Sequence, residues 1–544
     1  NKSPPKKTPR AAISLRELTS RKRASDMLET SLAILLLTQH TLALEILAII
    51  SVPLMSHYMA FRTLFHELAI RGHNVTVINN YPDKDPPPNL RFVDIKHQKN
   101  HSIPYLEHYE TQDSTFMHLI NMYRHISMGG GNTKLDCEHL FQSENVKAHF
   151  VEGRKYDVIF VEQFMSDCGL AYAMSLYDAP IIGITSHTLL PFAYSRLGLP
   201  FDVAADAFYF SNAGPNPSLF QRVETVIVKL MFTTVGRWYI QRSIYEVFDQ
   251  HVPHHSLDIE RDARLKMKMM FSYQHFSVTG ARPLAPQLLE IGGIHIGVPK
   301  AVSKEIEEFL SDAKDGAIYV SFGSNLKAST MTVRRRQAFL TAFKRLPYKV
   351  IWKYENASFT QDNLLTGNWF PQLDILCHPK VLAFVSHGGM LSLSESVHCG
   401  KPLITVPFFG DQFSNSAAVR AAGLGQTLFF DRLNADNLEA AIRDLTSPEK
   451  QQNAQRISRL WHDRPVPVME SAIYWTEYVA RHKSAPPSLP AKHNTWFEGL
   501  LIDVTIIIAA VFFLIGLIIY FILKLLKIIL GKLISFSRKK VKGE

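Results

Sequence analysis

The segment Trp369–Ala417, WFPQLDILCHPKVLAFVSHGGMLSLSESVHCGKPLITVPFFGDQFSNSA, decides how the rest of this sequence is interpreted. Within it, Val381–Ser386 is a short apolar run of the length expected for a buried parallel strand. His387-Gly388-Gly389 then permits a sharp turn and a close approach of the backbone to a ligand. A predicted helix follows, and its N-terminus would point free N–H groups and the positive end of its dipole at an anion. The segment therefore predicts a phosphate or diphosphate site.

Side chains on either side of this turn suit the other parts of a nucleotide sugar. Glu395 lies one helical turn after Ser392 and can accept hydrogen bonds from two ribose hydroxyls. Trp369 offers a flat face for a base, and Asp411 follows a second apolar strand, where it can bind sugar hydroxyls. A single Trp, His or glycine turn is ordinary in any protein, so the ordered set carries the inference. Its members are Trp369, Gln372, His387, Gly388, Gly389, Ser392, Glu395, Asp411 and Gln412.

This segment closely resembles the signature of the UDP-glycosyltransferase superfamily, family 1, which contains UDP-glucuronosyl- and UDP-glucosyltransferases. The run Phe384–Gly389, Ser392, Glu395 and Pro402 fall at the spacing of that signature. A weaker resemblance, closest in character to the insect enzymes, extends from about Ile46 to the C-terminus. It implies the α/β fold named GT-B, in which two Rossmann-like domains face each other across a cleft, followed here by a C-terminal transmembrane helix.

The resemblance adds one residue to the donor site and removes one contact from it. Ser324 follows the predicted strand Ala317–Ser321 and corresponds to the second phosphate contact of the family. Leu391 stands where many relatives carry Asn. A phosphate contact made by that Asn side chain therefore does not transfer to this chain.

A second chemical site is expected in the first half of the chain. Ile46–Val52 is a buried-strand run, Met59–Arg71 has helical periodicity and Val75–Ile78 begins another strand, which together indicate a βαβ unit. Ligands bind beyond the carboxyl ends of such strands, where we expect the loop Pro53–His57. The resemblance assigns His57 as the general base, and an imidazole is suited to removing a hydroxyl proton near neutral pH.

A histidine base is usually oriented by a carboxylate, and Glu162 is the candidate here because it follows the predicted strand Val158–Val161. Many vertebrate relatives have Asp at this place, whereas insect-like members have Glu. His57 and Glu162 are thus the candidate catalytic residues, and an ordinary loop role for each is the alternative. Between Ile181 and Phe276 the chain is rich in aromatic and Met residues. Most of these suit a core, and the rest suit an apolar acceptor pocket or a membrane-facing patch.

Several other classes of function are disfavoured by composition and motifs. The net charge is +10, but residues 1–26 hold eight Lys or Arg against two acids and residues 524–544 hold seven against one, so no nucleic-acid-binding face is expected in the body. Asp83-Lys84-Asp85 precedes three prolines and is interpreted as loop rather than as a metal–nucleotide motif. We therefore expect no metal and no cofactor besides the UDP-sugar co-substrate. The four cysteines lack metal-ligand spacing, and reduced core cysteines are favoured over disulfides.

The two ends of the chain predict a membrane-anchored secretory protein. Leu32–Leu37 resembles the apolar core of a signal peptide, and Val504–Leu523 is an uncharged run long enough to span a bilayer. Lys524 and further lysines follow it, which predicts a cytosolic tail, a lumenal body and single-pass type I topology. Lys540 and Lys542 resemble a dilysine retrieval signal of the endoplasmic reticulum. The predicted segments are 1–26 (disordered or upstream extension), 27–43 (signal peptide), 44–290 (acceptor-binding domain), 291–482 (UDP-sugar-binding domain), 483–503 (linker), 504–523 (membrane helix) and 524–544 (tail).

The sequence thus predicts an inverting transferase that moves a hexose from a UDP-sugar to a hydroxyl of a small lipophilic acceptor, giving a β-glycoside. UDP-glucose is favoured over UDP-glucuronate because no Arg or Lys follows Asp411-Gln412 until Arg420. The alternatives are a UDP-glucuronosyltransferase and a non-catalytic lipophile-binding protein of the same fold. A membrane receptor would need a signalling tail that residues 524–544 do not resemble. Homo-oligomerisation is left open.

Overall fold

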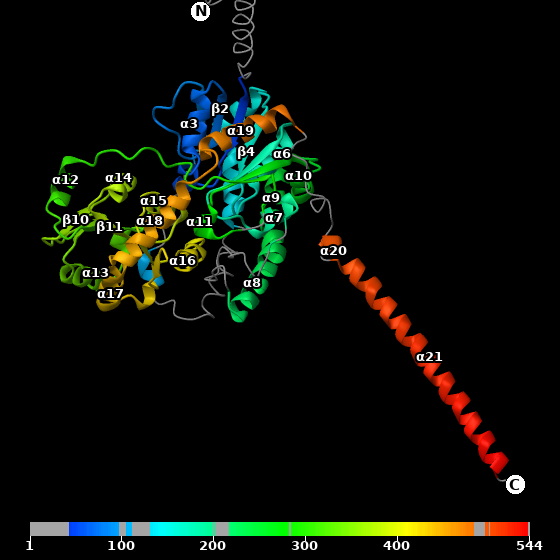
Figure 1. The fold of residues 1–544 in the computed structure, drawn as a ribbon. Helices are drawn as coiled ribbons and strands as arrows, with labels where there is room; N and C mark the ends of the chain where they lie inside the picture. Colours follow the sequence, from blue (N-terminus) through cyan, green and yellow to red (C-terminus); the bar gives the residue numbers. More distant parts are fainter. Residues whose placement is uncertain are drawn as a thin grey trace, which may run out of the picture. The chain divides into compact units, whose positions relative to one another are not determined.

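Two parallel β-sheets organise the protein (Figure 1). The computed structural model describes residues 43–96, 105–110, 131–199, 201, 217–281, 284–483, 496–499 and 501–541. The predicted signal peptide, the predicted N-terminal extension and most of the predicted linker lie outside these residues. Apolar runs such as ILAI and AIYVS form fully buried central strands, because helices cover both faces of an all-parallel sheet.

The first sheet has seven strands in the order β3-β2-β1-β4-β5-β6-β7. The strands are β1 Glu45–Ile49, β2 Asn74–Asn79, β3 Leu90–Asp94, β4 Val158–Glu162, β5 Ile181–Thr185, β6 Met267–Ser272 and β7 Leu288–Glu290. The order reverses between β1 and β4, which are hydrogen-bonded neighbours. Such a reversal opens a crevice at the carboxyl ends of the two strands, where ligands of doubly wound sheets bind.

The helices of this half are residues 131–142, α2 Met55–Met59, α3 Arg62–Ile70, α5 Glu144–Val151, α6 Cys168–Leu176, α7 Pro191–Leu197, α8 Leu219–Met231, the π-helix η2 Phe232–Gly236, α9 Arg237–His251, α10 Ile259–Lys266 and α11 Phe276–Thr279. The 3₁₀-helix η1 Leu106–Tyr109 packs instead on the second half, where the N–H of Leu106 donates to Oγ1 of Thr330 at 2.9 Å. The sequence predicted one helix from Met59 to Arg71 after a loop ending at His57. Instead, the chain breaks near Ala60-Phe61, and His57 lies in the separate short helix α2.

The second sheet repeats the same topology with six strands in the order β10-β9-β8-β11-β12-β13. They are β8 Ala317–Ser321, β9 Lys349–Lys353, β10 Leu364–Gly367, β11 Val381–Ser386, β12 Leu403–Thr405 and β13 Gly425–Thr427. The helices of this half are α12 Lys304–Ser311, η3 Ala328–Thr330, α13 Val333–Arg345, α14 Gln372–Cys377, α15 Met390–His398, α16 Gln412–Ala421, η4 Phe430–Arg432, α17 Ala435–Leu445 and α18 Pro448–His462. Here the strand order reverses between β8 and β11.

The helix α19 Val468–Arg481 follows the second sheet in sequence but packs on the first (Figure 1). It contacts α3, β4 and β6, and two polar contacts join it to the residues that follow α3. Arg71 donates to Glu470, and the ring of His73 lies 3.3 Å from the carboxylate of Glu477. The chain therefore crosses between the two sheets twice, once through residues 291–300 and once before α19.

Two disulfides correct the expectation of reduced cysteines. Cys137 is bonded to Cys168 with a Cα–Cα distance of 5.4 Å, and Cys377 is bonded to Cys399 at 4.7 Å. Both distances fall in the range that a disulfide requires. Partners separated by 31 and 22 residues share no recognisable motif, so only the tertiary contacts bring them together.

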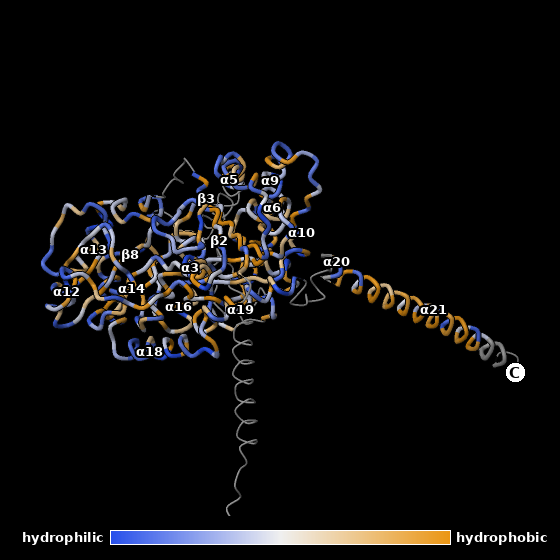
Figure 2. Tube along the Cα trace, turned by 90° about the horizontal axis from the view of Figure 1, so that it is seen from above, coloured by the Kyte–Doolittle hydropathy of each residue, from blue (hydrophilic) through white to orange (hydrophobic). Residues whose placement is uncertain are grey.

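The C-terminal end forms α20 Trp496–Gly499 and the long helix α21 Ile502–Val541. The stretch Ile502–Ser535 of α21 contains an 18-residue window with a mean hydropathy of 3.2 and no buried residues, so it meets the length and composition of a membrane span. Figure 2 shows apolar colouring along most of this helix. The predicted span 504–523 therefore lies in a helix that continues well beyond it.

Candidate functional site

The reversal point of the first sheet carries a hydrogen-bonded histidine–glutamate pair. His57 lies in α2, just after β1, and Glu162 is the last residue of the adjacent strand β4. Nδ1 of His57 is hydrogen bonded to Oε1 of Glu162, and the two residues are only 8% and 5% exposed. Because a carboxylate only accepts, Nδ1 carries a proton, and in the neutral imidazole Nε2 then presents a lone pair. The pair has the arrangement of an oriented general base.

Two aromatic rings that the sequence did not single out pack beside this base. The ring of Phe164 meets His57 edge-on at a centroid distance of 4.6 Å, and the ring of His187 lies 5.2 Å from Phe164 and 6.3 Å from His57. Burial lowers the pKa of His187 to about 3, so its imidazole is neutral and adds no charge beside His57. These rings restrict the orientation of the base.

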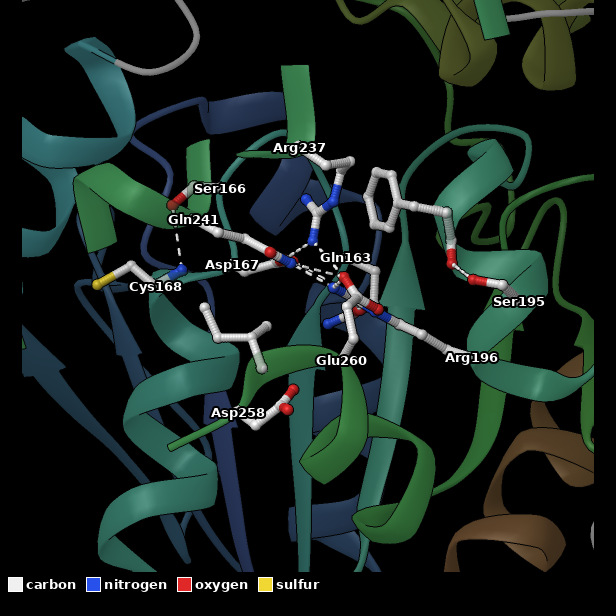
Figure 3. Close-up of polar contacts among 12 residues, drawn as sticks. Gln163, Ser166, Asp167, Cys168, Ser195, Arg196, Arg237, Gln241, Asp258 and Glu260 are labelled. Carbon is white, nitrogen blue, oxygen red and sulfur yellow. Dashed lines mark hydrogen bonds and ion pairs between the residues drawn. The ribbon is translucent and has the colours of Figure 1, made fainter. Parts of the chain in front are cut away.

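Figure 3 shows a charge cluster around Arg196 and Asp167, next to Gln163, the residue that follows β4. Gln163 donates to the backbone carbonyl of Glu162 at 3.2 Å and accepts from Arg196 at 2.6 Å. Arg196 also binds Asp167 and Glu260, and Arg237 joins both acids. Burial would raise the pKa of Asp167, but the two guanidiniums outweigh it and hold this pKa below its ordinary value. Two cations and two anions thus balance within the fold and fix the chain that follows β4.

The reversal point of the second sheet is built from glycines and backbone. Ser321 of β8 pairs with Ser386 of β11, so the turns that follow these strands lie next to each other. Gly323 has φ +77° and Gly388 has φ +85°, a conformation that residues with a Cβ adopt only at a cost. A Cβ on Gly323 would also lie 2.7 Å from Cε1 of His387. Both glycines are therefore needed for this turn to form around the imidazole.

His387 is placed to donate one hydrogen bond into this turn. Burial lowers its pKa to about 4, helped by the charge of Lys353, so the ring is neutral with one N–H. Its Nδ1 has no partner among the residues that the structure describes. Ser324 lies exposed in the neighbouring turn after β8. The N–H groups of Gly323 and Gly388 donate to Oγ of Ser321 and Ser386 at 3.3 and 3.2 Å. A diphosphate in this position would meet the neutral ring of His387 and the N-terminus of α15, with the ammonium of Lys353, which is paired with Glu355 at 2.9 Å, nearby.

The residues predicted to hold uridine come together at the start of α14 and on α15. Gln372 begins α14, and its Nε2 donates to Oγ of Ser392 at 3.0 Å and to Oε2 of Glu395 at 2.7 Å. Trp369 is 67% exposed, and Nζ of Lys353 lies 5.9 Å from the centroid of its ring. An exposed indole next to an amide and a carboxylate can stack on a base and bind a ribose.

Asp411 and Gln412 stand at the N-terminal end of α16, and their side chains make different contacts. Oδ2 of Asp411 accepts from Nδ2 of Asn415 at 2.8 Å. Burial raises the pKa of Asp411 to about 6, although Asn415 and the charge of His57 act in the opposite direction. The influence of His57 means that this carboxylate lies near the base of the first half. Gln412 uses its Oε1 to accept from the N–H groups of Phe408 and Phe409, so its side chain braces the preceding loop.

Asn415 is a site residue that the sequence interpretation missed. Its Nδ2 also donates to the carbonyl oxygen of Gly388 at 3.0 Å, which ties the diphosphate turn to Asp411. Its place one helical turn after Asp411 was the available signal, since residues four apart share a helix face.

The described part of the chain contains no group of three or more His, Cys, Asp or Glu that would hold a metal ion. The carboxylate of Asp83, in the predicted loop, is bound by Tyr58, Arg62 and His66.

Comparison with known proteins agrees with this architecture. The fold is that of GT-B glycosyltransferases: a UDP-glucosyltransferase from Polygonum tinctorium, described as capable of glucosylating indoxyl, superposes with a TM-score of 0.54 at 15% identity, over 81% of this chain and 99% of that one. The family model "UDP-glucoronosyl and UDP-glucosyl transferase" matches residues 47–540, and the chain belongs to this family.

Curated relatives cover most of the chain. UDP-glucosyltransferase 2 of Dactylopius coccus is 32% identical over 468 residues, which are 85% of this chain and 88% of that protein. UDP-glucuronosyltransferase 2A3 of Homo sapiens is 27% identical over 475 residues, or 83% and 87% of the two chains. The protein is therefore a UDP-sugar-dependent glycosyltransferase.

Proposed function

We propose that this glycosyltransferase moves glucose from UDP-glucose to a hydroxyl group of a small lipophilic acceptor, with inversion at the anomeric carbon. Nε2 of His57 takes the acceptor proton, and the acceptor oxygen forms a bond to the anomeric carbon. The bond from that carbon to the diphosphate oxygen breaks on the opposite face. The products are a β-glucoside and UDP, and Glu162 stabilises the imidazolium that forms. Detoxification or hormone inactivation fits such a reaction.

The hydrogen-bonded pair of His57 and Glu162 is the observation that carries this proposal. A protein that only bound lipophilic molecules would have no use for an oriented general base. The pair also lies at the reversal point of its sheet, where a ligand has access to the carboxyl ends of β1 and β4.

The diphosphate site supports the departure of UDP. As the bond to the sugar breaks, negative charge grows on the diphosphate, and fixed donors stabilise it most in a site from which water is excluded. We assign this role to His387, Ser324, Ser392 and the backbone of the glycine turn, with Lys353 supplying positive charge. Trp369, Gln372 and Glu395 would hold uridine, and Asp411 with Gln412 would hold the sugar.

The preference for glucose rests on the surroundings of Asp411. A glucuronate carboxylate would gain from a cation close to the sugar. Arg420, the next cation in the chain, lies in the last turn of α16, and its Nη1 donates to Oγ1 of Thr427 on β13 at 2.6 Å. This arrangement supports a neutral sugar in the donor site.

We further propose that α21 anchors the protein in the endoplasmic reticulum membrane with the catalytic body in the lumen. Glu498 and Asp503 precede the apolar stretch and Lys524, Lys527 and Lys532 follow or interrupt its end, which favours a cytosolic C-terminus. Changing Lys540 and Lys542 to Ser should move the protein to the cell surface, as surface labelling would detect. Unchanged retention would count against the retrieval signal.

An exposed apolar stripe on α8 supports a second contact with the bilayer surface. It consists of Leu219, Phe220, Val223, Val226, Ile227 and Leu230, all exposed and spaced as on one helical face. Arg222 and Lys229 flank the stripe on one side, as in helices that lie in the membrane interface. Lipophilic acceptors concentrate in the bilayer, so this contact would bring the acceptor-binding half close to its substrate.

UDP release by microsomes that contain the full-length protein tests this proposal. UDP-glucose and UDP-glucuronate are offered in parallel over a panel of phenols and steroids. We expect release that requires an acceptor and UDP-glucose and that is lost in His57→Ala. Release with UDP-glucuronate alone would reverse the assignment of the donor, and UDP binding without release from either donor would favour the non-catalytic alternative.

A further inference from the structure

A chain of hydrogen bonds connects the first sheet to the ribose-binding carboxylate of the second. Tyr273 directly follows β6, His295 lies in the crossing segment 291–300, and Glu395 lies on α15. The hydroxyl of Tyr273 is hydrogen bonded to Nδ1 of His295, and Nε2 of His295 lies 3.1 Å from Oε1 of Glu395. Neither His295 nor Tyr273 belongs to the signature segment.

The direction of these hydrogen bonds follows from the groups themselves. Burial raises the pKa of Tyr273, so its hydroxyl keeps its proton. The carboxylate of Glu395 only accepts, so Nε2 of His295 donates to it, and in the neutral ring Nδ1 is left with a lone pair. The hydroxyl of Tyr273 therefore donates its proton to Nδ1.

Two donors fix the carboxylate of Glu395 from opposite ends. His295 binds Oε1, and Gln372 binds Oε2 at 2.7 Å. The side chains of His295 and Glu395 are only 10% and 15% exposed. Because each carboxylate oxygen can accept more than one hydrogen bond, each retains a place for one ribose hydroxyl.

The crossing segment holds His295 in position. The carbonyl of Gly292 accepts from Arg464 at 2.7 Å, and that of Ile294 accepts from Oγ1 of Thr63 at 2.9 Å. Gly293 between them has φ +88°, and a Cβ there would collide with the ring of Trp461. The segment is thus fastened to both halves of the protein immediately before His295.

We propose that His295 is a positioning residue for the UDP-sugar donor: oriented by Tyr273, it fixes the carboxylate of Glu395 in the geometry that receives the two ribose hydroxyls. This inference rests on the ribose role proposed for Glu395. Under this proposal, recognition of the ribose depends on how the chain crosses between the two halves. The N–H group that binds Glu395 belongs to His295, which lies in the crossing segment itself.

The experiment compares the binding of UDP and of 2′,3′-dideoxy-UDP to the full-length protein in detergent. The wild type should bind UDP more tightly, because only UDP has the two hydroxyls. In His295→Leu we expect binding of UDP to weaken about tenfold, the size of one hydrogen bond to a charged group, with binding of the dideoxy compound unchanged. His295→Gln, which keeps an N–H near Glu395, should recover part of the loss, and Tyr273→Phe should weaken UDP binding a few-fold.

The control is His482→Leu, the same change at an exposed residue after α19, which should leave both affinities unchanged. Equal weakening of both nucleotides in His295→Leu and Tyr273→Phe would mean a structural role and would overturn the inference, as would unaltered UDP binding in both variants. A wild-type protein that does not distinguish the two nucleotides would instead refute the ribose role of Glu395, on which the inference depends.

Discussion

The two sheets share one topology, but the point where the strand order reverses is formed by side chains in the first sheet and by backbone in the second. In the first sheet the point between β1 and β4 holds side chains, the hydrogen-bonded pair of His57 and Glu162, packed among buried rings and charges. In the second sheet the point between β8 and β11 holds backbone, with Gly323 and Gly388 at positive φ and a neutral imidazole between the turns.

The roles proposed for the two points account for this difference. A proton acceptor works only with its lone pair fixed in direction, so the first point needs a second side chain and close packing around the base. A diphosphate is large and charged, so the second point needs several N–H groups at short range, which only a chain without Cβ atoms provides. Substitutions should therefore impair turnover at the first point and donor binding at the second.

The largest effect is expected at the base. His57→Ala should lower kcat by about 10³-fold, within the range of general base catalysis, because the variant loses the oriented lone pair that takes the acceptor proton. The affinity for UDP, measured by calorimetry on the same preparation, should stay at the wild-type value. A parallel loss of UDP binding would show that the two reversal points are not separate in function.

A smaller effect is expected at the partner of the base. Glu162→Gln should lower kcat by about 10²-fold, because an amide can donate to Nδ1 and so leave the proton on Nε2, where the lone pair is needed. Glu162→Asp is the matched variant: it keeps the carboxylate on a shorter arm and should retain more activity. Single-turnover rates at saturating donor measure both, and equal rates for the two variants would contradict the orienting role.

At the second point, Gly323→Ala should weaken UDP binding about tenfold, because the left-handed backbone costs a residue with a Cβ about 1–2 kcal/mol. The Cβ would also displace His387. Once donor is saturating, kcat should change little. Gly297→Ala is the control, since a Cβ there meets nothing within 4 Å. Similar losses in both variants would mean that the turn at Gly323 is not specific to the donor.

The smallest effect concerns Asp411, whose pKa burial raises to about 6. Above this pH the carboxylate is ionised and accepts sugar hydroxyls fully, and below it the group is protonated and accepts less well. KM for the UDP-sugar should therefore rise a few-fold as the pH falls through about 6, while Kd for UDP, which lacks the sugar, should not. Asp411→Asn should have a raised KM without that pH dependence. A wild-type KM that stays flat across this interval would exclude the sugar contact.

The same raised pKa makes the free energy of unfolding fall as the pH rises, whereas a carboxylate in an ordinary ion pair makes it rise. Because the folded protein holds this proton more tightly than the unfolded chain does, Asp411 favours the folded state at low pH. That contribution declines between about pH 4 and 6 and is absent above.

Local sequence patterns were sufficient to predict the strands and the position of the residues next to them. β1, β4, β8 and β11 are apolar runs, and the placement of His57, Glu162 and His387 at their carboxyl ends follows directly from that pattern. The family resemblance supplied the roles. The short helix α2 was missed because its five residues are too few to show a period.

What could not be predicted depends on contacts between distant segments. The role proposed for His295 depends on the contact between the crossing segment and α15, which lies a hundred residues further along the chain. The two disulfides and the cluster around Arg196 have the same character, since their partners lie from 22 to 70 residues apart and share no motif. Asn415 is the exception, because its distance from Asp411 is one helical turn.

The return of α19 to the first sheet limits how evolution or an engineer can recombine this protein. If relatives exchanged halves at the crossing segment alone, a foreign α19 would pack on the native α3. Arg71 and His73 could then lose their contacts with Glu470 and Glu477. A functional chimera that changes acceptor choice must therefore take residues 468–481 together with the first half. The part of the protein that must be exchanged to change acceptor specificity therefore consists of two segments that are separate in the sequence.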